Sequence, residues 1–174
     1  ENIKKRYSVN KIVIVHNGLE KQNYLSSSNI DNQKEIFNIL FIGGLIKLRN
    51  LTILVKSLKL LNINFKLSIV GDGPEKNNLI FLAKKLNLKN KIDFKGYKNK
   101  NFIRENHKKY DLFVSCTEKE GFGYAVFEAI CFKIPILIYK NSTYSKLINN
   151  NDNANYFDKI HEVSVSDSII KIYK

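Results

Sequence analysis

Short apolar stretches of this chain alternate with stretches whose apolar residues recur at helical spacing, and glycines stand at many of the joins. This alternation predicts repeated strand-helix units. Right-handed crossovers between the strands then make the sheet parallel, cover both of its faces with helices and leave the carboxyl ends of the strands free to bind ligands. The expected strands cover residues 36–42, 66–70, 92–94, 112–115 and 135–139, and the expected helices cover 51–61, 75–86, 102–107 and a segment within 122–132.

Polar and glycine-rich loops follow four of the predicted strands. They are Gly43-Gly44 with Arg49, Gly71-Asp72-Gly73-Pro74, Gly96-Tyr97-Lys98 and Glu120-Gly121-Phe122-Gly123. One such loop is weak evidence because glycines commonly form turns after strands, whereas four on one rim indicate a binding edge. None has the spacing of the dinucleotide fingerprint or of the nucleoside triphosphate loop, which disfavours NAD enzymes and triphosphatases.

Glu128 is the one acidic residue in an otherwise apolar stretch, which predicts a helix buried on all sides. A buried carboxylate needs a partner. Gly121 and Gly123 flank the expected helix start, where free backbone N–H groups favour a phosphate. A diphosphate at the helix start and ribose hydroxyls at Glu128 would together describe a nucleotide. The alternative is a structural helix in which Glu128 forms a buried ion pair.

Composition limits the remaining possibilities. The 174 residues suit one domain, and the absence of methionine suggests a domain taken from a longer protein. A net charge of +13 favours anionic partners, but the scattered lysines indicate a solvated basic surface more than a nucleic-acid site. Cys116 and Cys131 are expected to be reduced thiols in a cytosolic setting, and the three histidines lack metal-ligand spacing. No apolar run has the length of a membrane span.

An ordered set of motifs resembles one known family, the retaining glycosyltransferases of family 4, in the C-terminal, nucleotide-sugar-binding half of their GT-B fold. The matching segments are Val15-His-Asn17-Gly18, Phe41-Ile-Gly43-Gly44-Leu45 with Arg49-Asn50, Ile69-Val70-Gly71-Asp72-Gly73-Pro74, Phe94-Lys-Gly96, Asp111-Leu-Phe-Val, Thr117 to Gly123, and Glu128-Ala129 with Pro135. The two glutamates eight positions apart around the Gly-Phe-Gly turn are the most specific of these.

The resemblance implies a Rossmann-like, doubly wound parallel sheet flanked by helices, with an interdomain linker and entry segment at 1–30 and a nucleotide-sugar-binding domain at 31–174. It implies a hexosyltransferase that moves the sugar of a nucleoside diphosphate to a hydroxyl acceptor with retention. The implied partner is an N-terminal, acceptor-binding domain that this chain lacks, so the isolated domain is expected to be inactive. Neither a metal nor a cofactor is expected beside the donor, and nucleic acid is not an expected partner. The expected location is cytoplasmic and peripheral to the inner face of a membrane, with an anionic membrane surface as a further candidate partner.

The same resemblance assigns roles to single residues. The carboxylate of Glu120 would meet hydroxyls of the donor sugar, and that of Glu128 would bind the ribose. Arg49 would neutralise the leaving diphosphate, which makes Arg49 and Glu120 the expected catalytic residues. The other expected donor-binding residues are Gly43, Gly44, Gly71, Gly73, Tyr97, Lys98, Gly121, Phe122, Gly123 and Tyr124.

Three positions depart from the family pattern. Gly44 stands where the family has an arginine, which removes one of two cations expected at the diphosphate and leaves a non-catalytic nucleotide-sugar binder as the alternative function. Lys133 replaces a glycine after the helix that carries Glu128, and Lys146 lies near the position of a frequent acidic residue.

Overall fold

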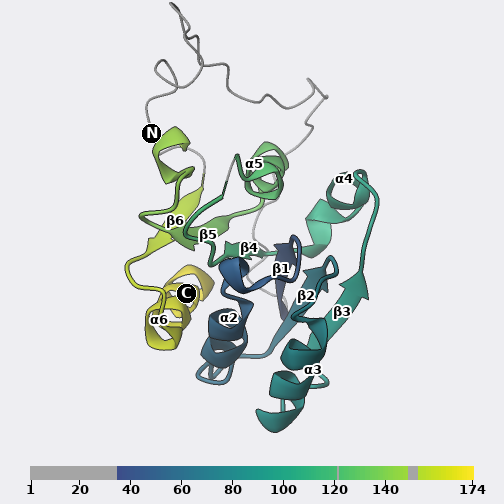
Figure 1. The fold of residues 1–174 in the computed structure, drawn as a ribbon. Helices are drawn as coiled ribbons and strands as arrows, with labels where there is room; N and C mark the ends of the chain where they lie inside the picture. Colours follow the sequence, from purple (N-terminus) through teal and green to yellow (C-terminus); the bar gives the residue numbers. More distant parts are fainter. Residues whose placement is uncertain (1–34, 121, 149–152) are drawn as a thin grey trace, which may run out of the picture.

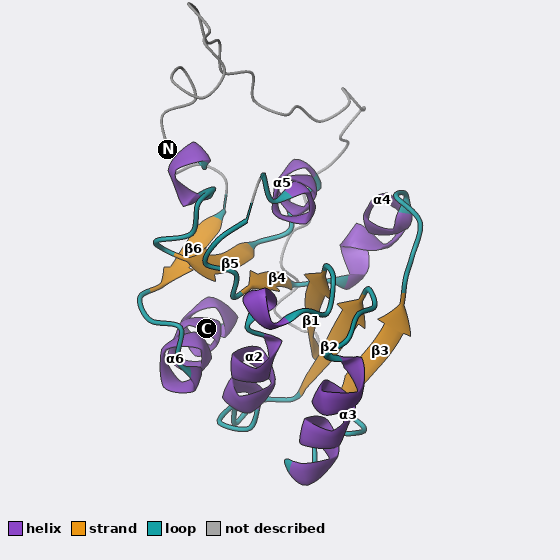
Figure 2. Cartoon of the chain, viewed as in Figure 1, coloured by secondary structure: helices purple, strands orange, loops and turns teal. Residues whose placement is uncertain are grey.

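The computed structural model describes residues 35–120, 122–148 and 153–174, which form a six-stranded parallel sheet with helices on both faces (Figures 1 and 2). The strand order is β3-β2-β1-β4-β5-β6. The strands are β1 (Phe37–Ile42), β2 (Phe65–Val70), β3 (Ile92–Gly96), β4 (Leu112–Ser115), β5 (Ile136–Tyr139) and β6 (Ala154–Phe157). The α-helices are α2 (Leu51–Leu58), α3 (Lys76–Lys85), α4 (Phe102–Asn106), α5 (Tyr124–Cys131) and α6 (Glu162–Tyr173), with short 3-10 helices at η1 (Lys47–Arg49), η2 (His107–Lys109) and η3 (Ser145–Leu147).

Two hydrophobic cores lie on opposite faces of the sheet. Successive strand residues point to opposite faces, so Ile39 and Phe41 of β1 join one core while Leu40 joins the other. Helices α2, α3 and α6 cover the first face, and α4 and α5 lie on the second (Figure 1). The expectation of a doubly wound α/β sheet is therefore confirmed.

The predicted elements agree with the observed ones to within a few residues. Helix α2 ends at Leu58, three residues before its predicted end, and α3 begins at Lys76, one residue after its predicted start. Beyond Tyr139 the structure adds β6, which extends the sheet at the β5 side, and α6. The expected linker at 1–30 lies outside the described residues, so that boundary stays a prediction.

The strand order reverses between β1 and β4. The chain passes from β1 outward to β2 and β3, then returns across the sheet to β4 and continues outward to β5 and β6. At such a switch point the loops after the two central strands run in opposite directions and leave a crevice. The loops after β1 and β4 carry Arg49 and Glu120.

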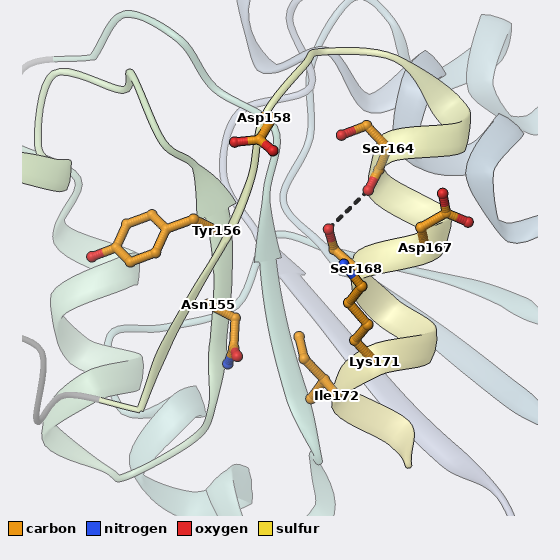
Figure 3. Close-up of a pocket in the computed structure, with 8 residues that line it drawn as sticks. All are labelled: Asn155, Tyr156, Asp158, Ser164, Asp167, Ser168, Lys171 and Ile172. Carbon is orange, nitrogen blue, oxygen red and sulfur yellow. Dashed lines mark hydrogen bonds between the residues drawn. The ribbon is translucent and has the colours of Figure 1, made fainter.

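A polar hollow lies at one edge of the sheet, between β6 and α6. Its volume is about 280 Å³, and Figure 3 shows the strand and helix side chains that line it. The Ser168 hydroxyl donates to the backbone oxygen of Ser164 within α6 (2.9 Å). The carboxylate of Asp158 at the rim pairs with Lys140 (2.7 Å). Because β6 is the last strand of the described sheet, this hollow is separate from the switch point.

Candidate functional site

Hydrogen bonds join the loops that follow β1, β2 and β3. The Gly43 N–H donates to the Val70 carbonyl (3.0 Å), and the Gly71 N–H donates to the Gly96 carbonyl (2.8 Å). Gly71 has φ +134°, and a Cβ added to it would lie 2.0 Å from the Gly43 oxygen. Only glycine allows this approach. Three of the predicted glycine loops therefore form one continuous edge.

An ion pair joins the loops on either side of the switch point. Nη1 of Arg49 contacts Oε2 of Glu120, and both side chains are about one-fifth exposed. The Asn50 side chain crosses the same gap and donates to the Cys116 carbonyl (3.0 Å). Within the part of the chain that the structure describes, the buried Nε of Arg49 has no acceptor. It lies 3.7 Å from the position that a Cβ on Gly43 would take. The two predicted catalytic residues thus meet, and one strong donor remains free.

The loop after β5 holds the Glu120 turn in place. The Thr143 hydroxyl accepts a hydrogen bond from the Glu120 N–H (3.1 Å) and donates to the Glu120 carbonyl (2.5 Å). Tyr144 is fully buried, its hydroxyl shares a hydrogen bond with Ser115 (2.8 Å), and a Cβ on Gly123 would come within 2.9 Å of its ring. Burial raises the pKa of Tyr144 to about 12, so its hydroxyl stays protonated.

The sequence pattern did not reveal Thr143 and Tyr144. The family pattern marks their segment by an acidic residue that this chain lacks, and Lys146 near that position is exposed. Thr143 and Glu120 are 23 residues apart, and no local signal links them. The position of the segment just after the carboxyl end of β5 was the one indication that it lies near the site.

The prediction that the α5 helix is buried on all sides is wrong. Val126 and Ala129 are buried, whereas Tyr124 is exposed and the remaining residues are partly exposed. Aromatic rings account for the apolar pattern because they cover one another: Phe122 stacks on Phe127 with ring centroids 4.6 Å apart. An apolar stretch can therefore arise from an aromatic cluster as well as from enclosure in a core.

Glu128 lies half-buried on α5. No other described side chain forms a hydrogen bond or an ion pair with its carboxylate, so nothing in the described structure supports the structural ion pair considered above. Burial raises the pKa of Glu128 above its ordinary value, because desolvation disfavours the charged form. Glu128 is the fifth residue of α5, about 6 Å along the axis from its first residue at ~1.5 Å per residue.

The remaining predicted residues differ in how closely they are held. Gly73 packs against the Leu45 backbone, with 2.6 Å between an added Cβ and the Leu45 oxygen. Gly44 has open space around it, with no atom within 4 Å of an added Cβ. Tyr97 and Lys98 are exposed at the end of β3, Tyr97 by 82%, and no hydrogen bond ties their side chains to the described site. Gly121 lies outside the described residues.

Lys133 adopts the left-handed conformation that its place after α5 predicts. Its φ is 57°, and its N–H donates to the Ile130 carbonyl (2.8 Å). A lysine therefore caps this helix in the geometry that usually favours glycine.

A hollow beside the Arg49–Glu120 pair was not predicted. Its volume is about 330 Å³, and it lies between η1 and the loop after β4. Its lining consists of Lys47, Leu48, Asn50, Glu118 and Lys119. Two ammonium groups, of Lys47 and Lys119, and the carboxylate of Glu118 therefore border this hollow.

In residues 35–120, 122–148 and 153–174, no three His, Cys, Asp or Glu side chains gather as a metal site, and neither Cys116 nor Cys131 forms a disulfide. None of the helices in those ranges combines the length and apolarity needed to cross a bilayer.

Comparison with known proteins identifies relatives of this chain. The family model for glycosyl transferases group 1 matches residues 20–174. In Campylobacter jejuni, the N-acetylgalactosamine-N,N'-diacetylbacillosaminyl-diphospho-undecaprenol 4-alpha-N-acetylgalactosaminyltransferase is 23% identical over the whole of this chain. The chain spans 50% of that relative's length.

Solved structures share the fold. Anabaena HepE in complex with UDP and glucose superposes with a TM-score of 0.71 at 20% identity, covering 79% of this chain and 38% of HepE. The C-terminal domain of a glycosyl transferase group 1 family protein from Francisella tularensis superposes with a TM-score of 0.69 at 19% identity, covering 78% and 74% of the two chains. These likenesses confirm the expected Rossmann-like fold of a GT-B half. Because the family model covers most of the sequence, the chain belongs to the glycosyl transferases of group 1.

Proposed function

We propose that this glycosyltransferase domain binds a nucleoside-diphosphate sugar at the β1/β4 switch point and supports retaining transfer of the sugar to a hydroxyl acceptor. The observation that carries the proposal is the Nε of Arg49, a buried cationic donor that lies beside the Gly43 turn and has no acceptor among the described residues. A buried donor without an acceptor is costly. A diphosphate oxygen at the Gly43 turn would satisfy it, because guanidinium and phosphate groups form charge-assisted hydrogen bonds.

Arg49 and Glu120 have complementary roles in this proposal. Arg49 offsets the negative charge that develops on the diphosphate as its bond to the anomeric carbon breaks. Glu120 orients the guanidinium through the ion pair and offers its second carboxylate oxygen to sugar hydroxyls. The clamp from Thr143 keeps the Glu120 backbone fixed, which limits the reorganisation needed when the donor binds.

Glu128 supplies the ribose contact. Its carboxylate has no described partner and bears a desolvation cost, and two ribose hydroxyls would compensate it with charge-assisted hydrogen bonds. Gly123 is the N-cap residue of α5, with φ 79°, and the helix start at Tyr124 would lie beside the diphosphate. Tyr97 and Lys98, exposed at the end of β3, would close over the base.

The acceptor side lies in a second domain. The name of the Campylobacter relative includes a diphospho-undecaprenol acceptor, and this chain spans half of that relative. We infer that the full-length protein adds an acceptor-binding domain across the switch point. A cytoplasmic location at the inner face of a membrane stays a prediction.

Arg49→Ala tests the proposed diphosphate site. The first step is a panel of UDP, GDP and ADP in thermal-shift assays, followed by calorimetry with the best diphosphate and its nucleoside. Arg49→Ala should weaken binding of the diphosphate by about 1.5–3 kcal/mol, because a charge-assisted contact is lost. Binding of the nucleoside should be almost unchanged.

Arg104→Ala is the matched control, because Arg104 is an exposed arginine on α4. It should change neither affinity. Equal loss of both ligands in Arg49→Ala would refute the role assigned to Arg49.

The open space at Gly44 favours a second candidate function, a non-catalytic nucleotide-sugar binder. In that case Gly44 marks a site that keeps the donor but lacks the second cation needed for its departure. Turnover by the full-length protein with a bound donor would exclude this alternative, and binding without turnover would support it.

A further inference from the structure

One corner of the sheet, at Lys66 and Ser68 of β2, is polar and open in the part of the chain that the structure describes. Parallel sheets are ordinarily covered on both faces, which makes their strands almost continuously apolar. On β2, however, Lys66 is exposed and Ser68 is half-buried, although Leu67 between them is fully buried on the opposite face. In register, Lys66 stands beside Asn38 of β1 and Ser68 beside Asp93 of β3. The result is a polar strip across three strands.

This strip borders a cavity of about 410 Å³ with a strong excess of positive charge. Four lysines and one aspartate line it: Lys66, Lys91, Lys95, Lys109 and Asp93. Lys95 pairs with Asp93 (2.5 Å), which leaves three ammonium groups. Lys109 donates to the neutral Asn106 amide oxygen (2.8 Å), and Lys91 lies over the Phe65 ring at 4.7 Å. Among the described residues, no second acidic side chain lines this cavity.

Gathered ammonium groups repel one another, so an anion bound between them would be stabilised by the whole group. The asparagine amides and the Ser68 hydroxyl at the wall add neutral donors. The hollow between β6 and α6 provides a contrast within the same molecule, because Asp158 and Asp167 outnumber Lys171 there (Figure 3). The two cavities therefore differ in the sign of the charge that they would attract.

We propose that the cavity bordered by β1, β2 and β3 binds a small phosphate-bearing ligand, such as a diphosphate or a phosphate ester. Its volume lies within the range of small-molecule sites, about 300–1,000 Å³, and its concave form suits a small ligand better than a flat membrane surface. Eight of its ten lining residues belong to the amino-terminal halves of β1, β2 and β3 or to the segments just before β3 and β4, whereas the donor site lies at the carboxyl ends of the strands. It is thus a second anion site, independent of the donor site.

The test is an NMR titration of the whole ¹⁵N-labelled chain with sodium pyrophosphate. We expect saturable shifts of the backbone amides from Lys66 to Ser68 and from Lys91 to Asp93. The double variant Lys66→Gln/Lys109→Gln should weaken binding at these amides by at least about tenfold, because two charge-assisted contacts are lost. Both side chains are exposed, and unchanged spectra elsewhere would show that the variant is folded.

The control double variant is Lys84→Gln/Lys171→Gln, which removes the same charge from exposed positions on α3 and α6. It should leave the affinity at the cavity within about twofold. The proposal is overturned if both double variants weaken binding equally, since bulk charge would then explain it, or if no saturable shift occurs at these amides. Co-sedimentation with phosphatidylglycerol vesicles that requires Lys66 and Lys109, without pyrophosphate shifts, would overturn it in favour of a membrane surface.

Discussion

Replacing Glu128 with glutamine should raise the stability of the free domain and weaken its binding of the donor. The carboxylate is half-buried, its pKa is raised by desolvation, and it has no partner among the described residues. Glutamine keeps the shape and removes the charge, so the cost of burying that charge disappears. A structural glutamate in an ion pair would behave in the opposite way, because its loss would leave an unpaired cation.

The loss of binding follows from the hydrogen bonds expected at the ribose. Charge-assisted bonds contribute about 1.5–3 kcal/mol, which corresponds to a Kd about 10- to 150-fold higher in the variant. With the diphosphate at 100 times the wild-type Kd, ligand stabilisation should fall from about 2.7 kcal/mol to about 0.3–1.4 kcal/mol. For a domain of this size the thermal shift should drop from about 5–11 °C to about 1–6 °C.

The stability difference should also depend on pH. Because the folded-state pKa of Glu128 is raised above its ordinary value of 4.5, folding favours the protonated form. The cost of the buried charge is fully present above the folded-state pKa. It is removed as the pH falls through that value and below 4.5. The advantage of Glu128→Gln over the wild type should therefore be largest near neutral pH and shrink on acidification.

Thermal unfolding with and without the best diphosphate of the panel measures both effects. Glu105→Gln is the matched control, because it removes one exposed carboxylate on α4 and should change neither quantity. A free Glu128→Gln domain that melts below the wild type would show that Glu128 is a structural residue. An unchanged ligand shift would remove Glu128 from the donor site.

Three further outcomes are expected. Gly71→Ala should lower the free energy of unfolding in urea by more than about 2 kcal/mol, because its Cβ would meet the Gly43 oxygen. Gly44→Ala has open space for its Cβ and should change that free energy by no more than about 0.5 kcal/mol. Similar losses in the two variants would contradict the contact geometry. Tyr144→Phe should cost about 1–2 kcal/mol in the same assay because the Ser115 hydroxyl loses a buried partner, and a neutral result would mean that the bond contributes nothing. This chain alone should bind donor yet transfer no sugar, since proximity and orientation supply ~7–11 kcal/mol that the acceptor domain must complete; rapid transfer to an added acceptor would refute the need for a second domain.

The strand-helix order from β1 to β5 was predictable from the sequence because its signals are local. The period-two spacing of strands and the helical spacing of apolar residues can each be recognised within about ten positions. The glycines mark turns that need the backbone freedom of glycine. The family motifs likewise placed Arg49 and Glu120 in loops that follow two of the predicted strands. The polar alternation of Lys66 and Ser68 was equally visible, but its meaning depended on whether a helix covers that face.

Tertiary packing decided the rest. Thr143 bonds Glu120 from 23 positions away in sequence, and Tyr144 bonds Ser115 from 29 positions away, through contacts that exist only once β4 and β5 are side by side. The exposure of α5 depended on aromatic rings stacking on one another, which has the same sequence pattern as burial in a core. Pairing, exposure and the charge of a cavity depend on which surfaces meet. Local sequence determines the elements themselves, because their hydrogen bonds and turns are short in range, whereas these properties arise from contacts between distant segments.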